Sequence, residues 1–252
     1  MSCPEAARLF LEHLDELVFV KSEREITYER WGTNEDEPYL QRLCELRETM
    51  IAAVWDETRN RADIFAGLVA VMKEVQRLCI AGEEMPPAKE IMQKHNHEGE
   101  LHISAQVTDQ MITNGFYHSR LKKISPKLYR LCRYYFKTFD RLTAEQADEL
   151  ADELRSKLHE DNPQLEHVLR GYVVYYLQMV FLEVYEDYSF LKKLATGIMH
   201  MHILELFLAL YYEKTKSLTL GELALLISVY ERRGRHNEDV SDGMYEKLYP
   251  VL

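Results

Sequence analysis

The sequence predicts an all-α protein, and three observations lead to this prediction. Only 10 Gly and 7 Pro occur in 252 residues, apolar residues recur at helical spacing over most of the chain, and residues that begin or end helices lie between those segments. We expect an orthogonal array of about nine helices, and a short β-hairpin could form near residues 18–30. A hydrophobic content of 46% can supply a sizeable core.

The first predicted helices follow from their end residues. Pro4 is typical of a first helical turn, where a proline removes no intrahelical hydrogen bond. Pro38 opens a second helix in the same way, and a third is expected over residues 62–80. Gly82 suits the left-handed conformation that closes a helix. The hairpin interpretation rests on two short apolar runs that flank a polar tetrapeptide within residues 18–30.

The stretch from residue 83 to residue 114 is the least regular and contains two consecutive prolines. We interpret it either as a long functional loop or as a seam. The seam would separate N-terminal helices over residues 1–82 from a helical core over residues 115–252. In both cases we expect a single helical domain over residues 1–252.

Helical patterns then continue to the C-terminus. Pro126, after a serine, predicts the start of one helix. In a capping box, side chain and backbone amide satisfy each other across three residues. Two pairs have this spacing: Thr143 with Gln146, and Thr219 with Glu222.

The charge and the apolar runs exclude several classes of protein. A net charge of −11 repels nucleic acid and anionic membranes. The most apolar run, residues 198–212, is interrupted by His200, His202 and Glu205, and a membrane span needs roughly 20 mostly apolar residues. This run therefore predicts a buried core helix. The N-terminus has no secretory signal pattern, and we expect a cytoplasmic protein that binds neither nucleic acid nor membrane.

Common cofactor and catalytic motifs are absent from the sequence. It has no GxGxxG, GxxxxGK[ST], GxSxG or HExxH. The 4 cysteines include no CxxC pair. This chain alone therefore has no complete cysteine-ligated metal site.

A run of basic residues begins the second half of the chain. On a helix that starts near Pro126, the side chains of Lys127, Arg130, Arg133 and Lys137 form a basic stripe. The stripe could bind an acidic partner surface. It could also face the acidic helix of the same chain or be a solvated helix face.

A few segments resemble one known family. The opening SCPEAAR, residues 2–8, resembles a segment of the flagellin lysine-N-methylase family. Later features are similar in the same order: paired helices over residues 40–50 and 64–78, a tyrosine-rich helix over residues 165–176, and Arg235-His236-Asn237, which resembles a C-terminal EHN region.

The resemblance implies an activity and two cofactors. Family members methylate lysine side chains of flagellin with S-adenosylmethionine, and carry a cysteine-rich region associated with a [4Fe–4S] cluster ahead of the SCPEAAR segment. It further implies that Cys3 is one cluster ligand, among the roughly four thiolates that such a cluster needs. The substrate would be a flagellin-like protein.

The cysteine-rich region is not in this sequence, so we expect the chain to be inactive by itself. It would be a natural truncation, an expressed C-terminal domain, or half of a split enzyme whose partner is a separate cysteine-rich region. The other three cysteines are expected to be apolar core residues.

The chemistry of methyl transfer suggests catalytic residues. The attacking amine must be neutral, and an unperturbed lysine has a pKa of about 10.4. Within the resemblance, Tyr172, Tyr176 and His236 are candidates for desolvating and deprotonating it, while no S-adenosylmethionine-binding residue can be named. The alternative function is a non-enzymatic helical protein–protein interaction domain, which would use the basic stripe or a tyrosine-rich groove.

Overall fold

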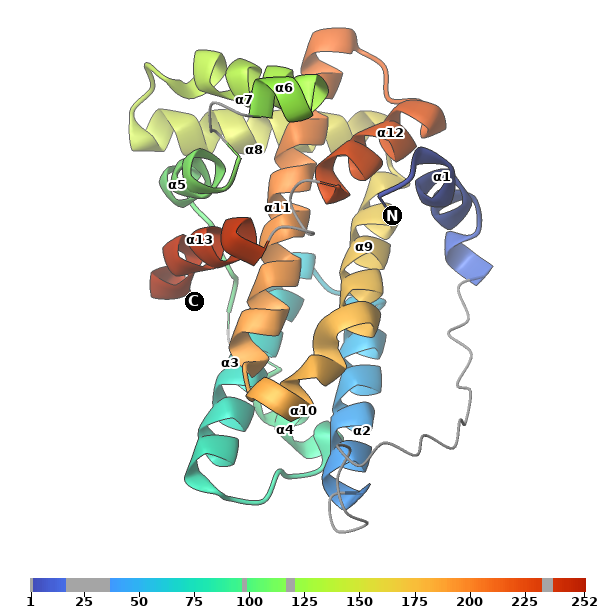
Figure 1. Cartoon of the computed structure of the whole chain (residues 1–252), viewed down its shortest axis with the longest axis vertical. Helices are drawn as coiled ribbons and strands as arrows, with labels where there is room; N and C mark the ends of the chain where they lie inside the picture. Colours follow the sequence, from blue (N-terminus) through green and yellow to red (C-terminus); the bar gives the residue numbers. More distant parts are fainter. Residues whose placement is uncertain (1, 17–36, 97–98, 117–120, 233–237) are drawn as a thin grey trace. The chain divides into compact units, whose positions relative to one another are not determined.

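The all-α prediction is confirmed in a computed structural model of the chain (Figure 1). The structure describes residues 2–16, 37–96, 99–116, 121–232 and 238–252. These residues form helices, turns and connecting segments, and no strand occurs among them. The hairpin predicted near residues 18–30 lies outside the described residues.

Thirteen labelled α-helices and three 3-10 turns make up the described chain. The α-helices are α1 (Pro4–Glu12), α2 (Glu37–Val54), α3 (Arg61–Ala81), α4 (Ala88–Lys94), α5 (Ala105–Gly115), α6 (Leu121–Ile124), α7 (Pro126–Phe139), α8 (Ala144–Asp161), α9 (Leu165–Val180), α10 (Val184–Asp187), α11 (Phe190–Thr215), α12 (Leu220–Glu231) and α13 (Glu238–Leu248). The 3-10 turns are η1 (Leu14–Glu16), η2 (Phe181–Glu183) and η3 (Tyr249–Val251). The α-helices of the described chain outnumber the nine or so that the sequence predicts, because helices such as α4, α6 and α10 are very short.

The predicted helix ends are confirmed where the sequence carried a specific signal. Gly82 closes α3 with a φ of 69°, a conformation that costs glycine little because it has no Cβ. Both predicted capping boxes form, one at the start of α8 and one at the start of α12. Pro126 is in the first turn of α7, although Ser125 makes no side-chain capping bond there.

The interpretation of residues 83–114 as a long loop is wrong, because α4 and most of α5 lie there. The signal was present in the sequence. Ser104 caps α5 by accepting a hydrogen bond from the backbone amide of Val107, and the buried residues of α5 recur at helical spacing.

The chain divides into two compact units, each described by itself. Unit 1 comprises residues 1–12, 101–173 and 195–252, and unit 2 comprises residues 13–100 and 174–194. One of these divisions, after Glu100, falls within the expected seam. The expectation of a single domain stays a prediction.

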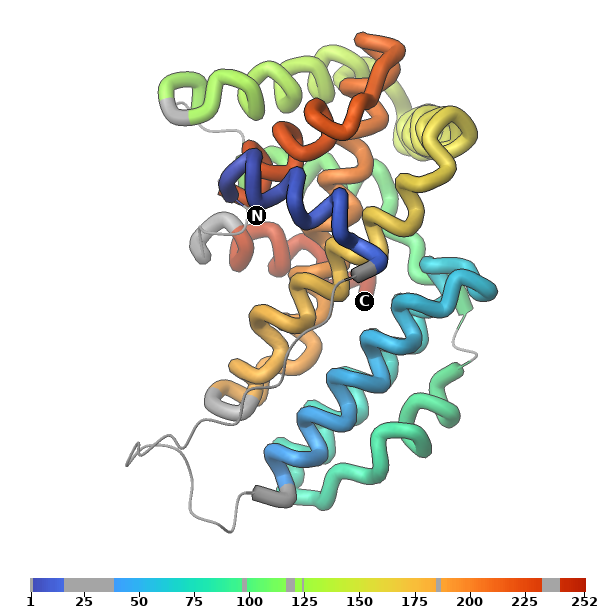
Figure 2. The backbone as a smooth tube through the Cα atoms, turned by 90° about the vertical axis from the view of Figure 1, so that its right-hand side faces the viewer, coloured from blue at the N-terminus to red at the C-terminus, as the bar shows by residue number. Residues whose placement is uncertain are grey.

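Unit 2 is built around α2, α3 and α4, which pack against one another (Figure 2). Gly67 of α3 lets the chain at the end of α4 come close, since a Cβ there would meet the His95 carbonyl oxygen at 2.8 Å. Glu74 holds the same end, with one carboxylate oxygen 2.7 Å from Lys94 Nζ and the other hydrogen-bonded to His95. Glycine and carboxylate together fix α4 on α3.

Unit 1 contains α1, α5 to α8, α12 and α13, with parts of α9 and α11. Helix α1 packs on α12, and α13 packs on α5 (Figure 1). In the core, the rings of Phe116, Phe207 and Tyr230 lie with centroids 5.4 to 6.3 Å apart, within the range of favourable aromatic pairs. Arg232 donates to the Ser2 carbonyl oxygen at 2.9 Å and so ties the end of α12 to the start of the chain.

The apolar helix α11 is long and apolar enough to cross a membrane by length and composition alone. However, 89% of its most apolar window is buried inside the structure. This burial is typical of a core helix, as the sequence predicted.

Candidate functional site

Unit 1 contains two neighbouring sets of hydrogen-bonded polar side chains, which we together call the closed cluster: Tyr172 with Glu231, and His200 with Tyr230 and the half-buried Ser241. Tyr172 donates to the Glu231 carboxylate at 2.5 Å, and these two residues are 1% and 0% exposed. His200 is also 0% exposed; its Nδ1 lies 2.8 Å from the Tyr230 hydroxyl and its Nε2 lies 3.2 Å from Ser241 Oγ. Buried polar groups are costly unless they are hydrogen-bonded, and here they bond one another.

A second polar chain links α5, α8 and α11 in the same unit. His202 Nε2 lies 2.9 Å from Thr108 Oγ1 and 3.1 Å from an Arg155 guanidinium nitrogen. Glu205 bonds His159 at 2.7 Å and lies 3.7 Å from the Arg155 guanidinium. This chain fixes α8 on α11.

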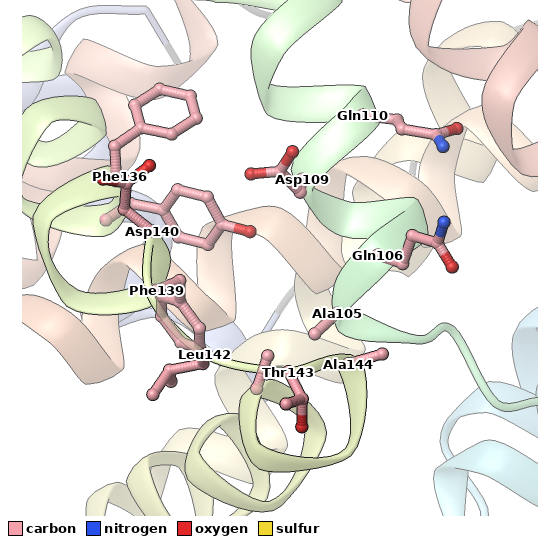
Figure 3. A pocket seen from close by; sticks show the side chains of 12 residues that line it. Ala105, Gln106, Asp109, Gln110, Phe136, Phe139, Asp140, Leu142, Thr143 and Ala144 are labelled. Carbon is pink, nitrogen blue, oxygen red and sulfur yellow. The ribbon is translucent and has the colours of Figure 1, made fainter.

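A third polar feature is open to solvent. We call it the acidic pocket, and it has a volume of about 580 Å³. It lies between α5, the end of α7 and the start of α8 (Figure 3). Its lining residues are Ala105, Gln106, Asp109, Gln110, Tyr135, Phe136, Phe139, Asp140, Leu142, Thr143, Ala144 and Ala147.

Two carboxylates and an aromatic wall define the chemistry of the acidic pocket. Asp109 points from α5 toward α7, where Phe136 and Phe139 are located (Figure 3). Burial raises the pKa of Asp109, while a hydrogen bond with Tyr135 partly offsets this and the nearby charge of Asp140 adds to it. Burial, and then the Asp109 charge, also raise the pKa of Tyr135, so its hydroxyl stays protonated.

The proposed catalytic residues are not brought into one described site. Tyr172 belongs to unit 1 and its hydroxyl is bonded to Glu231. Tyr176 is buried and belongs to unit 2. His236 lies outside the described residues. Their catalytic roles therefore stay predictions.

The predicted metal ligand, Cys3, is exposed at the start of α1. Hydrogen bonds from the backbone amides of Ala6 and Glu5 lower its pKa and favour the thiolate. In contrast, Cys132 is buried, and burial raises its pKa to about 12. No group of three or more potential ligands lies together in the described part of the chain.

The predicted basic stripe is on α7, and its members differ. Lys127 Nζ lies 5.9 Å from the centre of the Tyr211 ring, and burial lowers its pKa. Arg130, Arg133 and Lys137 are exposed. None of these three forms an ion pair with another described residue, so the solvated and the partner-binding interpretations of the stripe both stand.

Asp109 and Asp140 are not among the candidate residues that the sequence predicts. Asp109 lies in the segment that the sequence predicts as a loop or a seam, and Asp140 is the only acid within residues 120–141, in an otherwise basic run. That isolated acid at the end of a predicted helix was the available signal. That Asp109 and Asp140 line the same pocket depends on the tertiary arrangement of α5, α7 and α8, which no local pattern specifies.

The fold and these features define a class: a helical module without a nucleotide-binding loop among its described residues, and with an open acidic pocket. The sequence model of the FliB lysine N-methylase C-terminal domain matches residues 44–249. The chain belongs to this family, as the sequence resemblance indicated. Comparisons with curated proteins and with solved structures gave no match.

Proposed function

We propose that this chain is the helical, substrate-side module of a protein-lysine N-methylase. Joined to a cysteine-rich, cluster-bearing region in the cytoplasm, it takes part in methyl transfer from S-adenosylmethionine to lysine side chains of a flagellin-like protein. The observation that carries this proposal is the family match, which spans residues 44–249.

The described residues do not fit a complete iron–sulfur site. Such a cluster takes about four thiolates, whereas Cys132 is buried and Cys3 is the exposed cysteine of the described chain. The lowered pKa of Cys3 suits one thiolate ligand in a site that another region completes. We assign no step of the reaction to a cluster on this chain.

The acidic pocket does not fit S-adenosylmethionine. This donor, when bound, supplies an activated methyl group, and its amino-acid part carries a carboxylate that calls for a cationic partner. The charged side chains that line the pocket are Asp109 and Asp140, and no basic side chain is among its described lining residues. The proposal therefore leaves the donor site unassigned.

The chain's own residues contribute by positioning groups and holding protons. The lysine nitrogen must lose its proton before its lone pair attacks a methyl group. Tyr172, Tyr176 and His236 remain our candidates near that amine. Because Tyr172 already donates to Glu231, its hydroxyl would position a neighbouring group and would not accept the proton.

Reconstitution tests the proposal directly. This chain would be combined with a cysteine-rich region, the cluster rebuilt under anaerobic conditions, and a flagellin-like substrate supplied with isotopically labelled S-adenosylmethionine. We expect labelled methyl groups on lysine that require both proteins, measured by mass spectrometry. Methylation that proceeds equally well without this chain contradicts the proposal.

Variants in the same assay test individual residues. We expect Cys3→Ser to lower both cluster absorbance and methylation. Normal methylation rates in Tyr172→Phe and His236→Ala would remove these two residues from the catalytic proposal without affecting the family assignment.

A second candidate function is favoured by the exposed part of the basic stripe. Arg130, Arg133 and Lys137 present an uncompensated positive face on a chain of net charge −11, so an acidic protein surface could bind there. Charge reversal of Lys127, Arg130 and Arg133 should then weaken partner binding most at low salt. Unchanged affinity under that condition would remove this function.

A further inference from the structure

The acidic pocket differs from a plain acidic surface because its two carboxylates differ in their exposure to solvent. Asp109 is half-buried and Asp140 is exposed, and both carboxylates line the same pocket. Asp109 lies in the pocket with the buried Tyr135, which is also a lining residue. The pocket therefore presents one half-buried carboxylate and one exposed carboxylate, and this arrangement favours a cation.

The helix ends around the acidic pocket add to this preference. Helix α7 ends at Phe139, so the negative end of its dipole lies beside the pocket. The positive end of α8 also lies there, but the Thr143 capping box satisfies backbone amides of its first turn, and Glu145 places a negative charge in that turn. The two carboxylates and the end of α7 thus all place negative charge beside the pocket.

The aromatic wall suits an alkyl stem. The rings of Tyr135 and Phe139 stack on each other with centroids 4.8 Å apart, and Phe136 meets Tyr135 edge-on at 5.3 Å. Because these rings pair with one another, they form a wall and not a cage around a cation. A lysine side chain combines an apolar stem with a compact ammonium head, which matches a wall with carboxylates beside it.

Other ligands match the acidic pocket less well. S-adenosylmethionine lacks a cationic partner for its carboxylate here. A divalent metal is disfavoured because no group of three potential ligands is found among the described residues. Methylated lysine has fewer N–H donors for the carboxylates and would depend on the missing aromatic cage.

We propose that the acidic pocket binds the protonated lysine side chain of the protein substrate, as a recognition subsite. The proposal deepens the proposed function and rests on it, because it takes the substrate to be a lysine-bearing protein. The carboxylates hold the charged form of lysine, whereas methyl attack needs the neutral form. The pocket therefore recognises lysine and does not activate it.

The test uses the full chain and peptides that carry one lysine in a flagellin-like sequence. Binding is followed by NMR titration, with matched peptides in which the lysine is replaced by norleucine, arginine or trimethyl-lysine. The test variants are Asp140→Asn and Asp109→Asn with Asp140→Asn. The matched control is Glu149→Gln with Glu153→Gln, which removes the same charge from the exposed face of α8 outside the pocket lining.

We expect the lysine peptide to shift resonances of the pocket residues, and to bind about tenfold or more weakly in the double Asp variant, as for the loss of charge-assisted hydrogen bonds. The Glu control should bind as the wild type does, and the norleucine peptide should bind weakly throughout. Asp140→Asn alone, at an exposed helix end that tolerates asparagine, keeps the test valid if Asp109→Asn impairs folding.

Three outcomes would overturn the proposal: equal binding of the lysine and norleucine peptides, stronger binding of trimethyl-lysine than of lysine, or displacement of the lysine peptide by S-adenosylmethionine. The proposed function is measured separately. Methylation by the reconstituted enzyme without lysine binding here refutes the subsite alone, and lysine binding without methylation refutes the proposed function alone.

Discussion

The polar side chains of unit 1 occur in two contrasting settings, one buried and one open to solvent. In the closed cluster, Tyr172 and Glu231 are both almost fully buried and bond each other. In the acidic pocket, Asp140 is exposed and Asp109 is half-buried. Groups that satisfy one another stabilise a core, whereas carboxylates left accessible are available to a ligand. The difference teaches where each group can act: the bond between Tyr172 and Glu231 is expected to contribute to stability, whereas the acidic pocket is our proposed binding feature.

The largest effect on stability should come from opening the closed cluster. Tyr172→Phe removes the donor that faces the buried Glu231 carboxylate, and we expect a loss of about 1–3 kcal/mol in the free energy of unfolding. Urea denaturation measures it. Tyr134→Phe is the control, because the half-buried Tyr134 ring packs under Lys214 Nζ at 5.6 Å and keeps that contact. Equal losses of stability in the two variants would contradict a specific contribution of the bond between Tyr172 and Glu231.

A smaller loss of stability is expected from the polar network on the surface, at the start of α12. There, the Thr219 hydroxyl accepts from the Glu222 amide at 3.3 Å, and the Glu222 carboxylate accepts from the Thr219 amide at 2.8 Å. Thr219→Ala should cost about 1 kcal/mol, whereas Thr219→Ser should restore most of it. A Thr219→Ser variant as unstable as Thr219→Ala would contradict capping as the cause.

A substitution in the acidic pocket should change the stability in the opposite direction. Because burial raises the pKa of Asp109, the folded state disfavours its charged form, and stability falls as pH rises from 3.8, its ordinary value, through the raised pKa. Asp109→Asn removes this cost and should leave the protein as stable or slightly more stable at neutral pH. Thermal unfolding at pH 7 measures it. A clear loss of stability would make Asp109 part of the structural core.

Local signals predicted the parts of this molecule that depend on local physics. The helix ends at Gly82, at Pro126 and at the two capping boxes each depend on only a few neighbouring residues. These helix ends were therefore predicted well. Helix α5 could have been predicted from Ser104 and its apolar spacing. The acidic pocket could not, because Asp109 and Asp140 come to line one pocket only through the tertiary arrangement of α5, α7 and α8.

The smallest expected effect is a pH dependence at the surface network. Hydrogen bonds from the Thr219 amide, and then from the Tyr211 and Thr219 hydroxyls, lower the pKa of Glu222 from 4.5 to about 2. A depressed pKa in the folded state stabilises the protein fully above the unfolded value. That contribution is lost as pH falls from about 4.5 toward about 2. Urea denaturation across this range should show a shallower acid loss in Glu222→Gln than in the wild type. The matched variant Glu149→Gln, on an exposed helix face, should keep the wild-type slope, and identical slopes in all three proteins would refute the assignment to Glu222.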